Sequence, residues 1–123
     1  MIISRTPLRL SIGGGGTDLP FYYRKEEGSL VTATMDKYVY CVVKERFEEE
    51  IRLSYSENEE VCSLENLEND RAKEVLKVSG LEKYKEVVTM ADAPAGSGLG
   101  SSGAFTVGLL NAAQTYNGKN LSD

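Results

Sequence analysis

The sequence predicts an α+β domain, and three observations carry that prediction. Runs rich in β-branched and aromatic residues recur along most of the chain, as strands require. A polar segment with a one-sided apolar pattern, residues 63–80, has helical length, and so does an apolar segment after a glycine-rich loop, residues 104–116. The length of 123 residues allows one small domain, expected to span residues 1–123.

The N-terminal part is predicted to contain a strand, a loop and a short helix. Residues 1–12 have strand character that is interrupted at Pro7, because proline cannot donate a hydrogen bond to a neighbouring strand. Residues 13–18, GGGGTD, predict a loop. Residues 19–26, LPFYYRKE, predict a short helix because Pro20 suits a first turn.

The middle of the chain is predicted to hold further strands and a polar helix. In one strand Val39, Cys41 and Val43 share a face, and residues 63–80 form a helix that Gly80 ends. The apolar stripe of this helix consists of Leu64, Leu67, Ala72, Val75 and Leu76. The predicted strands are residues 29–35, 37–47, 50–56 and 86–92.

Charge and hydropathy narrow the class of protein. The formal net charge of -5 provides no basic field for nucleic acid or anionic lipid, so neither is an expected partner. No run approaches the roughly 18 apolar residues of a membrane span, and the N-terminus does not resemble a signal peptide, so we expect a cytoplasmic protein. The chain has no histidine, which removes zinc sites based on histidine and a Ser-His-Asp triad built from these residues alone.

The stretch from Pro94 to Ala104, PAGSGLGSSGA, places a glycine-rich loop at the start of a predicted helix. Ser101 is expected to cap this helix and Gly118 to end it. Its apolar residues occupy nearly every side, which predicts burial all round. They are Ala104, Phe105, Val107, Leu109, Leu110, Ala112, Ala113 and Tyr116.

A loop of this kind suits a phosphate group. The helix N-terminus presents free amides and a partial positive charge, while glycines let successive N–H groups converge on an anion. The alternative is a flexible surface turn with a serine cap.

Two other glycine motifs do not fit this loop. The dinucleotide motif G-x-G-x-x-G is matched by Gly98, Gly100 and Gly103, but it should follow a strand directly, and here DAPAGS intervenes. The motif G-x-x-x-x-G-K-[ST] fails because no lysine follows these glycines.

The same stretch resembles the phosphate-binding motif of the GHMP kinases, which include galactokinase, homoserine kinase and mevalonate kinase. That motif reads P-x-x-x-G-L-G-S-S-x-A, and every fixed position is present. The resemblance implies that the loop wraps the phosphates of ATP and that Ser102 helps to bind Mg²⁺. The loop residues that it implicates are Pro94, Gly96, Ser97, Gly98, Leu99, Gly100, Ser101, Ser102 and Gly103.

The N-terminus resembles a second motif of the same family. TPLRLSIGGGGTDLP is similar to P-G-R-V-N-L-I-G-E-H-T-D-Y, with Pro7, Arg9, Thr17 and Asp18 matched and Gly15 and Gly16 in place of Glu-His. The resemblance implies that Asp18, with Thr17, Gly15 and Gly16, binds sugar hydroxyls and that Arg9 is catalytic beside the reacting hydroxyl. The alternatives are a turn-capping role for Asp18 and a surface ion pair for Arg9.

The resemblance implies a fold similar to domain 2 of ribosomal protein S5, with a left-handed β-α-β unit. It implies an ATP- and Mg²⁺-dependent kinase that acts on a small sugar or sugar phosphate. The branch with heptose 7-phosphate kinases is most similar and predicts phosphorylation at the anomeric hydroxyl of D-glycero-D-manno-heptose 7-phosphate. The alternatives are a fucokinase or galactokinase type of enzyme and a non-catalytic nucleotide-binding module. The oligomeric state stays open.

The family's catalytic aspartate and its Mg²⁺-binding glutamate follow the helix after the glycine loop. The sequence ends at Asp123, a few residues beyond that predicted helix. We therefore expect the chain to be an N-terminal fragment of a kinase, inactive by itself.

Overall fold

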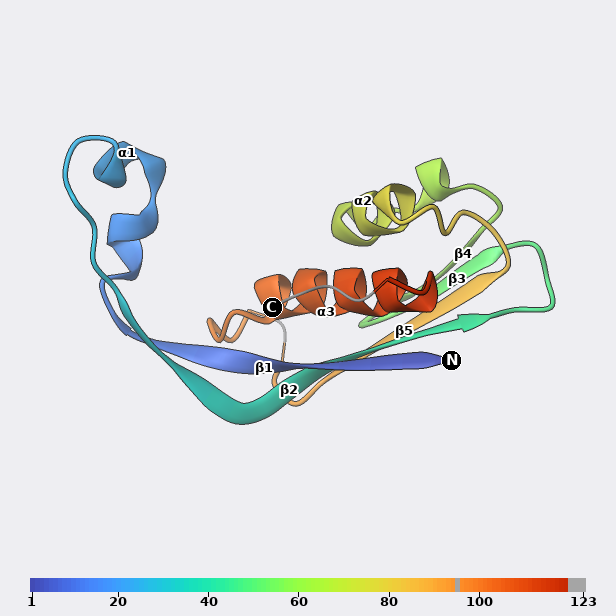
Figure 1. Ribbon diagram of the computed structural model, residues 1–123, viewed down its shortest axis with the longest axis horizontal. Helices are drawn as coiled ribbons and strands as arrows, with labels where there is room; N and C mark the ends of the chain where they lie inside the picture. The colour runs from blue at the N-terminus through green and yellow to red at the C-terminus, as the bar shows by residue number, and fades with distance from the viewer. Residues whose placement is uncertain (95, 120–123) are drawn as a thin grey trace.

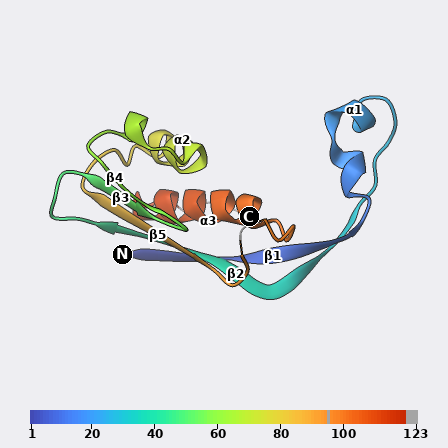
Figure 2. The same cartoon turned by 180° about the vertical axis from the view of Figure 1, so that it is seen from behind.

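A computed structural model describes residues 1–94 and 96–119 of the chain. Within these residues five strands form one sheet in the order β1-β2-β5-β3-β4. Strands β3 and β5 run parallel, and the other neighbours are antiparallel. The sheet packs against helices on one face, as Figures 1 and 2 both show. The strands are β1 (Ile2–Gly13), β2 (Val31–Glu45), β3 (Ile51–Ser54), β4 (Asn58–Val61) and β5 (Lys85–Ala91), and the covering helices are α2 (Asp70–Val78) and α3 (Ser101–Tyr116).

Strand β2 is continuous, so the predicted division into strands at residues 29–35 and 37–47 is wrong. Its pairing with β1 changes register: Pro7 pairs with Tyr38, but Arg9 pairs with Thr34. Strand β2 therefore contains extra residues opposite Leu8. The polar residues Asp36 and Lys37, which suggested a break, lie in this irregular part of a continuous strand. Contrary to the prediction, strand β1 itself is not interrupted at Pro7; only its pairing register changes, between Pro7 and Arg9.

The segment predicted as one helix over residues 63–80 is shorter and in two parts. A 3-10 turn, η2 (Leu64–Asn66), precedes α2, which begins after Asn69. The Asn69 side chain accepts a hydrogen bond of 3.1 Å from the Ala72 amide, so it caps the helix. Gly80 follows the helix with φ +71°, as a helix stop requires. The whole predicted apolar stripe, from Leu64 to Leu76, is buried.

The core lies between the inner face of the sheet and helix α3. Val39, Cys41 and Val43 are buried on this face, as their alternation predicts. Helix α3 contacts β1 and β2 on one side and α2 on another. The prediction that α3 is buried on all sides is wrong at Val107, which is 60% exposed. Among the described helices, none is long and apolar enough to cross a membrane.

The far ends of β1 and β2 form an arm that projects beyond the sheet (Figure 1). The arm carries a 3-10 turn, η1 (Gly15–Asp18), where a loop was predicted, and α1 (Pro20–Tyr23), which is shorter than predicted. The Thr17 hydroxyl lies 2.7 Å from the Gly14 carbonyl oxygen and 2.8 Å from that of Ser29, and it accepts from the Ser29 amide. Thr17 thereby joins the two sides of the arm.

Candidate functional site

The glycine-rich loop connects β5 to α3 in an unusual backbone conformation. Gly96, Gly98 and Gly100 have φ values of +77°, +76° and +71°. Residues with a side chain rarely adopt this region, so the alternate glycines are a requirement of the backbone. Asp92 fixes the start of the loop, because its carboxylate accepts from the Tyr38 amide and its amide donates to the Tyr38 carbonyl oxygen, both at 2.9 Å.

The loop leads directly into the first turn of α3. Gly100 is the N-cap residue and Ser101 is the first helical residue, so the predicted cap at Ser101 is displaced by one position. No side-chain hydrogen bond caps the described start of this helix. The first-turn amides are therefore available to an anion, which the helix dipole also favours. Ser102 is exposed and Ser101 is half-buried.

Arg9 brings the N-terminal motif against this loop. Its backbone amide donates a hydrogen bond of 3.1 Å to the Leu99 carbonyl oxygen. Its side chain crosses Gly100 so closely that a methyl group there would lie 3.0 Å from Arg9 Nε. Two motifs about 90 residues apart in the sequence are thus neighbours in the fold.

A cavity of about 270 Å³ lies where these motifs meet. Gly15 lines it, whereas Gly16 and Thr17 do not, and the Thr17 hydroxyl is engaged within the arm. Asp18 ends η1, but its side chain lies outside the described part of the structure. The lining residues are Arg9, Ser11, Gly15, Leu30, Thr32, Gly98 and Gly100.

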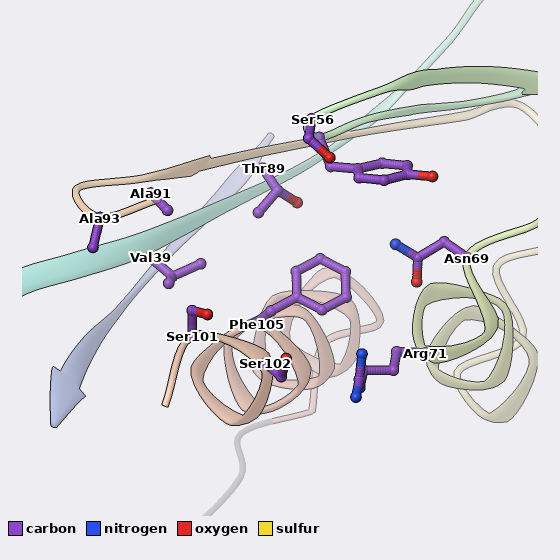
Figure 3. Close-up of a pocket in the computed structure, with 11 residues that line it drawn as sticks. Val39, Ser56, Asn69, Arg71, Thr89, Ala91, Ala93, Ser101, Ser102 and Phe105 are labelled. Carbon is purple, nitrogen blue, oxygen red and sulfur yellow. The ribbon is translucent and has the colours of Figure 1, made fainter. Parts of the chain in front are cut away.

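A second cavity, of about 360 Å³, lies on the other side of the loop between the sheet, α2 and α3. Figure 3 shows Asn69 and Arg71, at the start of α2, facing Ser102 and Phe105 from α3 across it. The Thr89 hydroxyl on the sheet wall is buried and has no hydrogen-bond partner among the described residues. The lining residues are Val39, Tyr55, Ser56, Asn69, Arg71, Thr89, Ala91, Ala93, Ser101, Ser102 and Phe105.

The charge around the two cavities suits an anion. Arg9 lines the first and Arg71 lines the second. Among the described residues, no aspartate or glutamate lines either one. The glycine loop borders both cavities, through Gly98 and Gly100 on one side and Ser101 and Ser102 on the other. The arrangement fits a phosphate chain along the loop, with one organic group in each cavity.

The walls of the second cavity include residues that sequence reasoning missed. Tyr55 lies in the turn after β3, and Asn69 and Arg71 lie at the start of α2, far in sequence from the glycine loop. The pattern Asn-Asp-Arg before an apolar stripe is a helix-start signal, but it indicates nothing about a neighbouring cavity. The predicted loop residues Pro94, Ser97 and Gly96 are exposed, and Gly103 lies in the first turn of α3.

Comparisons with known proteins agree with this fold. The family model of the GHMP kinases N terminal domain matches residues 61–123. A D-glycero-alpha-D-manno-heptose 7-phosphate kinase from Campylobacter jejuni is 32% identical over 90% of this chain. A solved D-glycero-D-manno-heptose 1-phosphate kinase from Bacteroides thetaiotaomicron superimposes with a TM-score of 0.84 at 30% identity over 99% of this chain. A mevalonate kinase from Methanococcus jannaschii, 19% identical over 98% of this chain and 42% of its own, shares the fold with a TM-score of 0.72.

These matches define the class of protein. The chain belongs to the GHMP kinase family and carries its N-terminal domain fold, a mixed α+β sheet. Among its members, the chain is similar to heptose phosphate kinases at about 30% identity. It spans 36% of the length of the curated relative and 44% of the solved heptose phosphate kinase.

Proposed function

We propose that this chain carries the ATP- and sugar-binding half-sites of a sugar-phosphate kinase. The observation that supports this most strongly is the position of the glycine loop between two cavities, with Arg9 bonded to the loop on one side and Ser102 on the other. A kinase must hold a phosphoryl donor and an acceptor on opposite sides of the transferred group. The family relationship supports the interpretation of the two cavities as sites for a phosphoryl donor and an acceptor.

In the proposed complex, the β- and γ-phosphates of ATP follow the loop from Gly96 to Ser102. The amides at the start of α3 bind the phosphate oxygens, and the base and ribose occupy the cavity lined by Tyr55, Asn69 and Arg71. The absence of acidic residues from the described lining and the unpartnered Thr89 hydroxyl both fit a polar, anionic ligand.

Mg²⁺ would be held by the Ser102 hydroxyl together with phosphate oxygens and water, since Mg²⁺ in such sites keeps most of its ligands from substrate and solvent. Among the described residues, no group of three or more Asp, Glu, Cys or His side chains is placed to hold a metal. The bound ion supplies neutralisation of the phosphate charge.

The acceptor sugar would lie in the cavity beside Arg9, with Asp18 and its neighbours on the arm binding hydroxyl groups. The acceptor oxygen forms a bond to the γ-phosphorus, the bond from that phosphorus to the bridging oxygen of ADP breaks, and the hydroxyl proton leaves to a base. The family resemblance assigns that base to an aspartate following α3. Arg9 would stabilise the charge on the transferred group.

For the acceptor we propose D-glycero-D-manno-heptose 7-phosphate, phosphorylated at the anomeric hydroxyl. The two heptose kinases that resemble this chain carry names with different phosphate positions, 7-phosphate and 1-phosphate. The test must therefore vary the acceptor.

The experiment measures ATP turnover by the full-length protein with heptose 7-phosphate, heptose 1-phosphate, fucose, galactose and mevalonate, and locates the new phosphate by ³¹P NMR. We expect the highest kcat/KM for heptose 7-phosphate. Preference for an unphosphorylated sugar would move the assignment to the fucokinase or galactokinase type. ATP binding without transfer to any acceptor would favour the non-catalytic module.

The proposed role of Asp18 can be tested separately. Asp18→Ala should lower kcat/KM for the sugar about ten- to a hundredfold with ATP binding retained.

A further inference from the structure

One carboxylate, that of Glu59 in β4, ties together the wall of the second cavity. Its Oε1 accepts a hydrogen bond of 2.6 Å from the Glu68 amide. Its Oε2 accepts from the Tyr55 hydroxyl at 3.0 Å and from the Asn69 amide at 3.4 Å. A single side chain thus joins the end of β3 to the turn that starts α2. Glu59 itself is not among the residues that line the cavity.

The residues that Glu59 holds do line the cavity. The Tyr55 hydroxyl is committed to Glu59, which fixes the ring in the wall. Partial burial, and then the hydrogen bond to Glu59, raise the pKa of Tyr55 to about 12.

Asn69 is fixed in a second way. Its Oδ1 accepts from the Ala72 amide, and this bond decides which end of the side-chain amide is oxygen. The Asn69 nitrogen is then directed toward the cavity, as Figure 3 shows. The backbone bond to Glu59 and the cap together present an NH₂ donor at a fixed place, next to Arg71.

We propose that Glu59 is a positioning residue for the base and ribose end of the nucleotide. It acts through Tyr55 and Asn69 and touches no ligand. This inference rests on the proposed function, since it assumes that the cavity holds the organic part of ATP. None of the hydrogen bonds of Glu59 described above reaches the glycine loop on the opposite wall. Phosphate binding should therefore not depend on Glu59.

Glutamine cannot replace Glu59, although it has the same shape. Both carboxylate oxygens accept bonds, from three donors in total. The amide has one acceptor oxygen, so in either orientation its NH₂ group faces a backbone N–H that cannot accept from it, that of Glu68 or that of Asn69. The loss of a half-buried hydrogen bond of this kind is expected to weaken ATP binding about tenfold.

The test compares two ligands, Mg²⁺–ATP and Mg²⁺–tripolyphosphate, by titration calorimetry on the full-length protein. Tripolyphosphate probes the loop without a base or ribose. For Glu59→Gln we expect about tenfold weaker ATP binding and unchanged tripolyphosphate binding. The control Glu57→Gln changes an exposed carboxylate nearby, for which no ion pair or side-chain hydrogen bond is found among the described residues, and should leave both affinities as in the wild type.

Equal weakening of both ligands, or of neither, would overturn the inference. Tyr55→Phe keeps the ring but removes its bond to Glu59, so it should weaken ATP binding by about two- to fivefold at constant tripolyphosphate affinity. If Glu59→Gln does not fold, an unchanged ratio of the two affinities in Tyr55→Phe overturns the inference. Failure of the proposed function itself is visible separately, because the wild-type protein would then bind neither ligand.

Discussion

Ser4 and Gly108 are in contact across the interface between strand β1 and helix α3. The Ser4 hydroxyl donates a hydrogen bond of 2.7 Å to the Gly108 carbonyl oxygen, and both residues are buried. A methyl group at Gly108 would lie 2.7 Å from Thr6 Oγ1 and 3.3 Å from Ser4 Oγ. The helix that carries the phosphate loop is therefore seated on the sheet at a distance that only glycine permits.

Gly108→Ala should destabilise the protein by about 1–3 kcal/mol, because the added methyl group separates α3 from β1. This loss outweighs the gain of about 1 kcal/mol that alanine brings to a helix. Gly103→Ala is the matched control in the same helix, since a methyl group there meets nothing within 4 Å. It should be neutral or stabilising. Urea denaturation of both variants is the measurement, and equal effects would contradict the close packing at Gly108.

Gly100→Ala should impair catalysis more than Gly98→Ala does. Both glycines have positive φ, so alanine costs about 1–2 kcal/mol of backbone strain at either position. Only at Gly100 does the new methyl group meet Arg9, 3.0 Å from Nε and 3.1 Å from Cγ, whereas Gly98 has open space. Displacement of Arg9 should lower kcat by a further 10- to 100-fold, on the order that misplaced groups cost.

Steady-state kinetics with both substrates and direct measurement of ATP affinity separate the two effects. The ATP affinity should fall to a similar extent in the two variants, because the strain in the loop is similar. A kcat that is equal in Gly100→Ala and Gly98→Ala would show that Arg9 does not act from its place beside Gly100.

Local sequence patterns predicted most of the fold, and the failures have physical causes. The buried face of β2, with Val39, Cys41 and Val43, alternates clearly and was predicted correctly. Strand β4 has the sequence Asn-Glu-Glu-Val and no apolar alternation. It exists because it pairs with β3 in a hairpin at the edge of the sheet, and such an edge strand does not need apolar alternation.

The glycine loop and the wall of the second cavity also differ in how far the sequence predicted them. The glycine loop was predictable because positive φ and a helix N-terminus impose glycine and serine locally. The cavity wall of Tyr55, Asn69 and Arg71 was not, because β3 reaches β5 only through the parallel pairing of strands separated by a helix. The contact of Arg9 with Leu99 was not predicted either, since no spacing rule joins two residues so far apart in the sequence.

The ion pair between Arg46 and Glu60 should contribute to the pH dependence of stability. The hydrogen bond of 2.9 Å from the Arg46 guanidinium, with the nearby Arg52, lowers the pKa of Glu60 below its ordinary value of 4.5. A carboxyl group with a lowered pKa stabilises the folded state fully above its ordinary pKa. That contribution is lost as the pH falls through the lower, folded-state pKa.

Glu60→Gln should therefore show a smaller loss of stability than the wild type between about pH 5 and about pH 3. The urea midpoint at each pH is the measurement. Because Glu60 is exposed, the difference should shrink at high salt concentration. Identical pH profiles at low salt would mean that this ion pair does not contribute to acid stability.

Ser101 and Ser102 offer a matched pair of hydroxyl groups for testing the metal site. Both lie in the first turn of α3 and both line the second cavity. The Ser102 carbonyl oxygen accepts a hydrogen bond of 2.9 Å from the Thr106 hydroxyl, but this bond uses the backbone and survives a change of side chain. Alanine at either position keeps the backbone amides that would bind phosphate.

Ser102→Ala should lower kcat at least about tenfold and raise the Mg²⁺ concentration needed for half-maximal activity, because it removes the proposed metal ligand. Ser101→Ala should leave the Mg²⁺ dependence unchanged, and in the absence of Mg²⁺ both variants should bind ATP as the wild type does. Turnover measured as a function of Mg²⁺ concentration at saturating substrates distinguishes the two serines. The same Mg²⁺ dependence in both variants would place the metal elsewhere, because two hydroxyl groups one residue apart on a helix point in different directions and cannot ligate one ion equivalently.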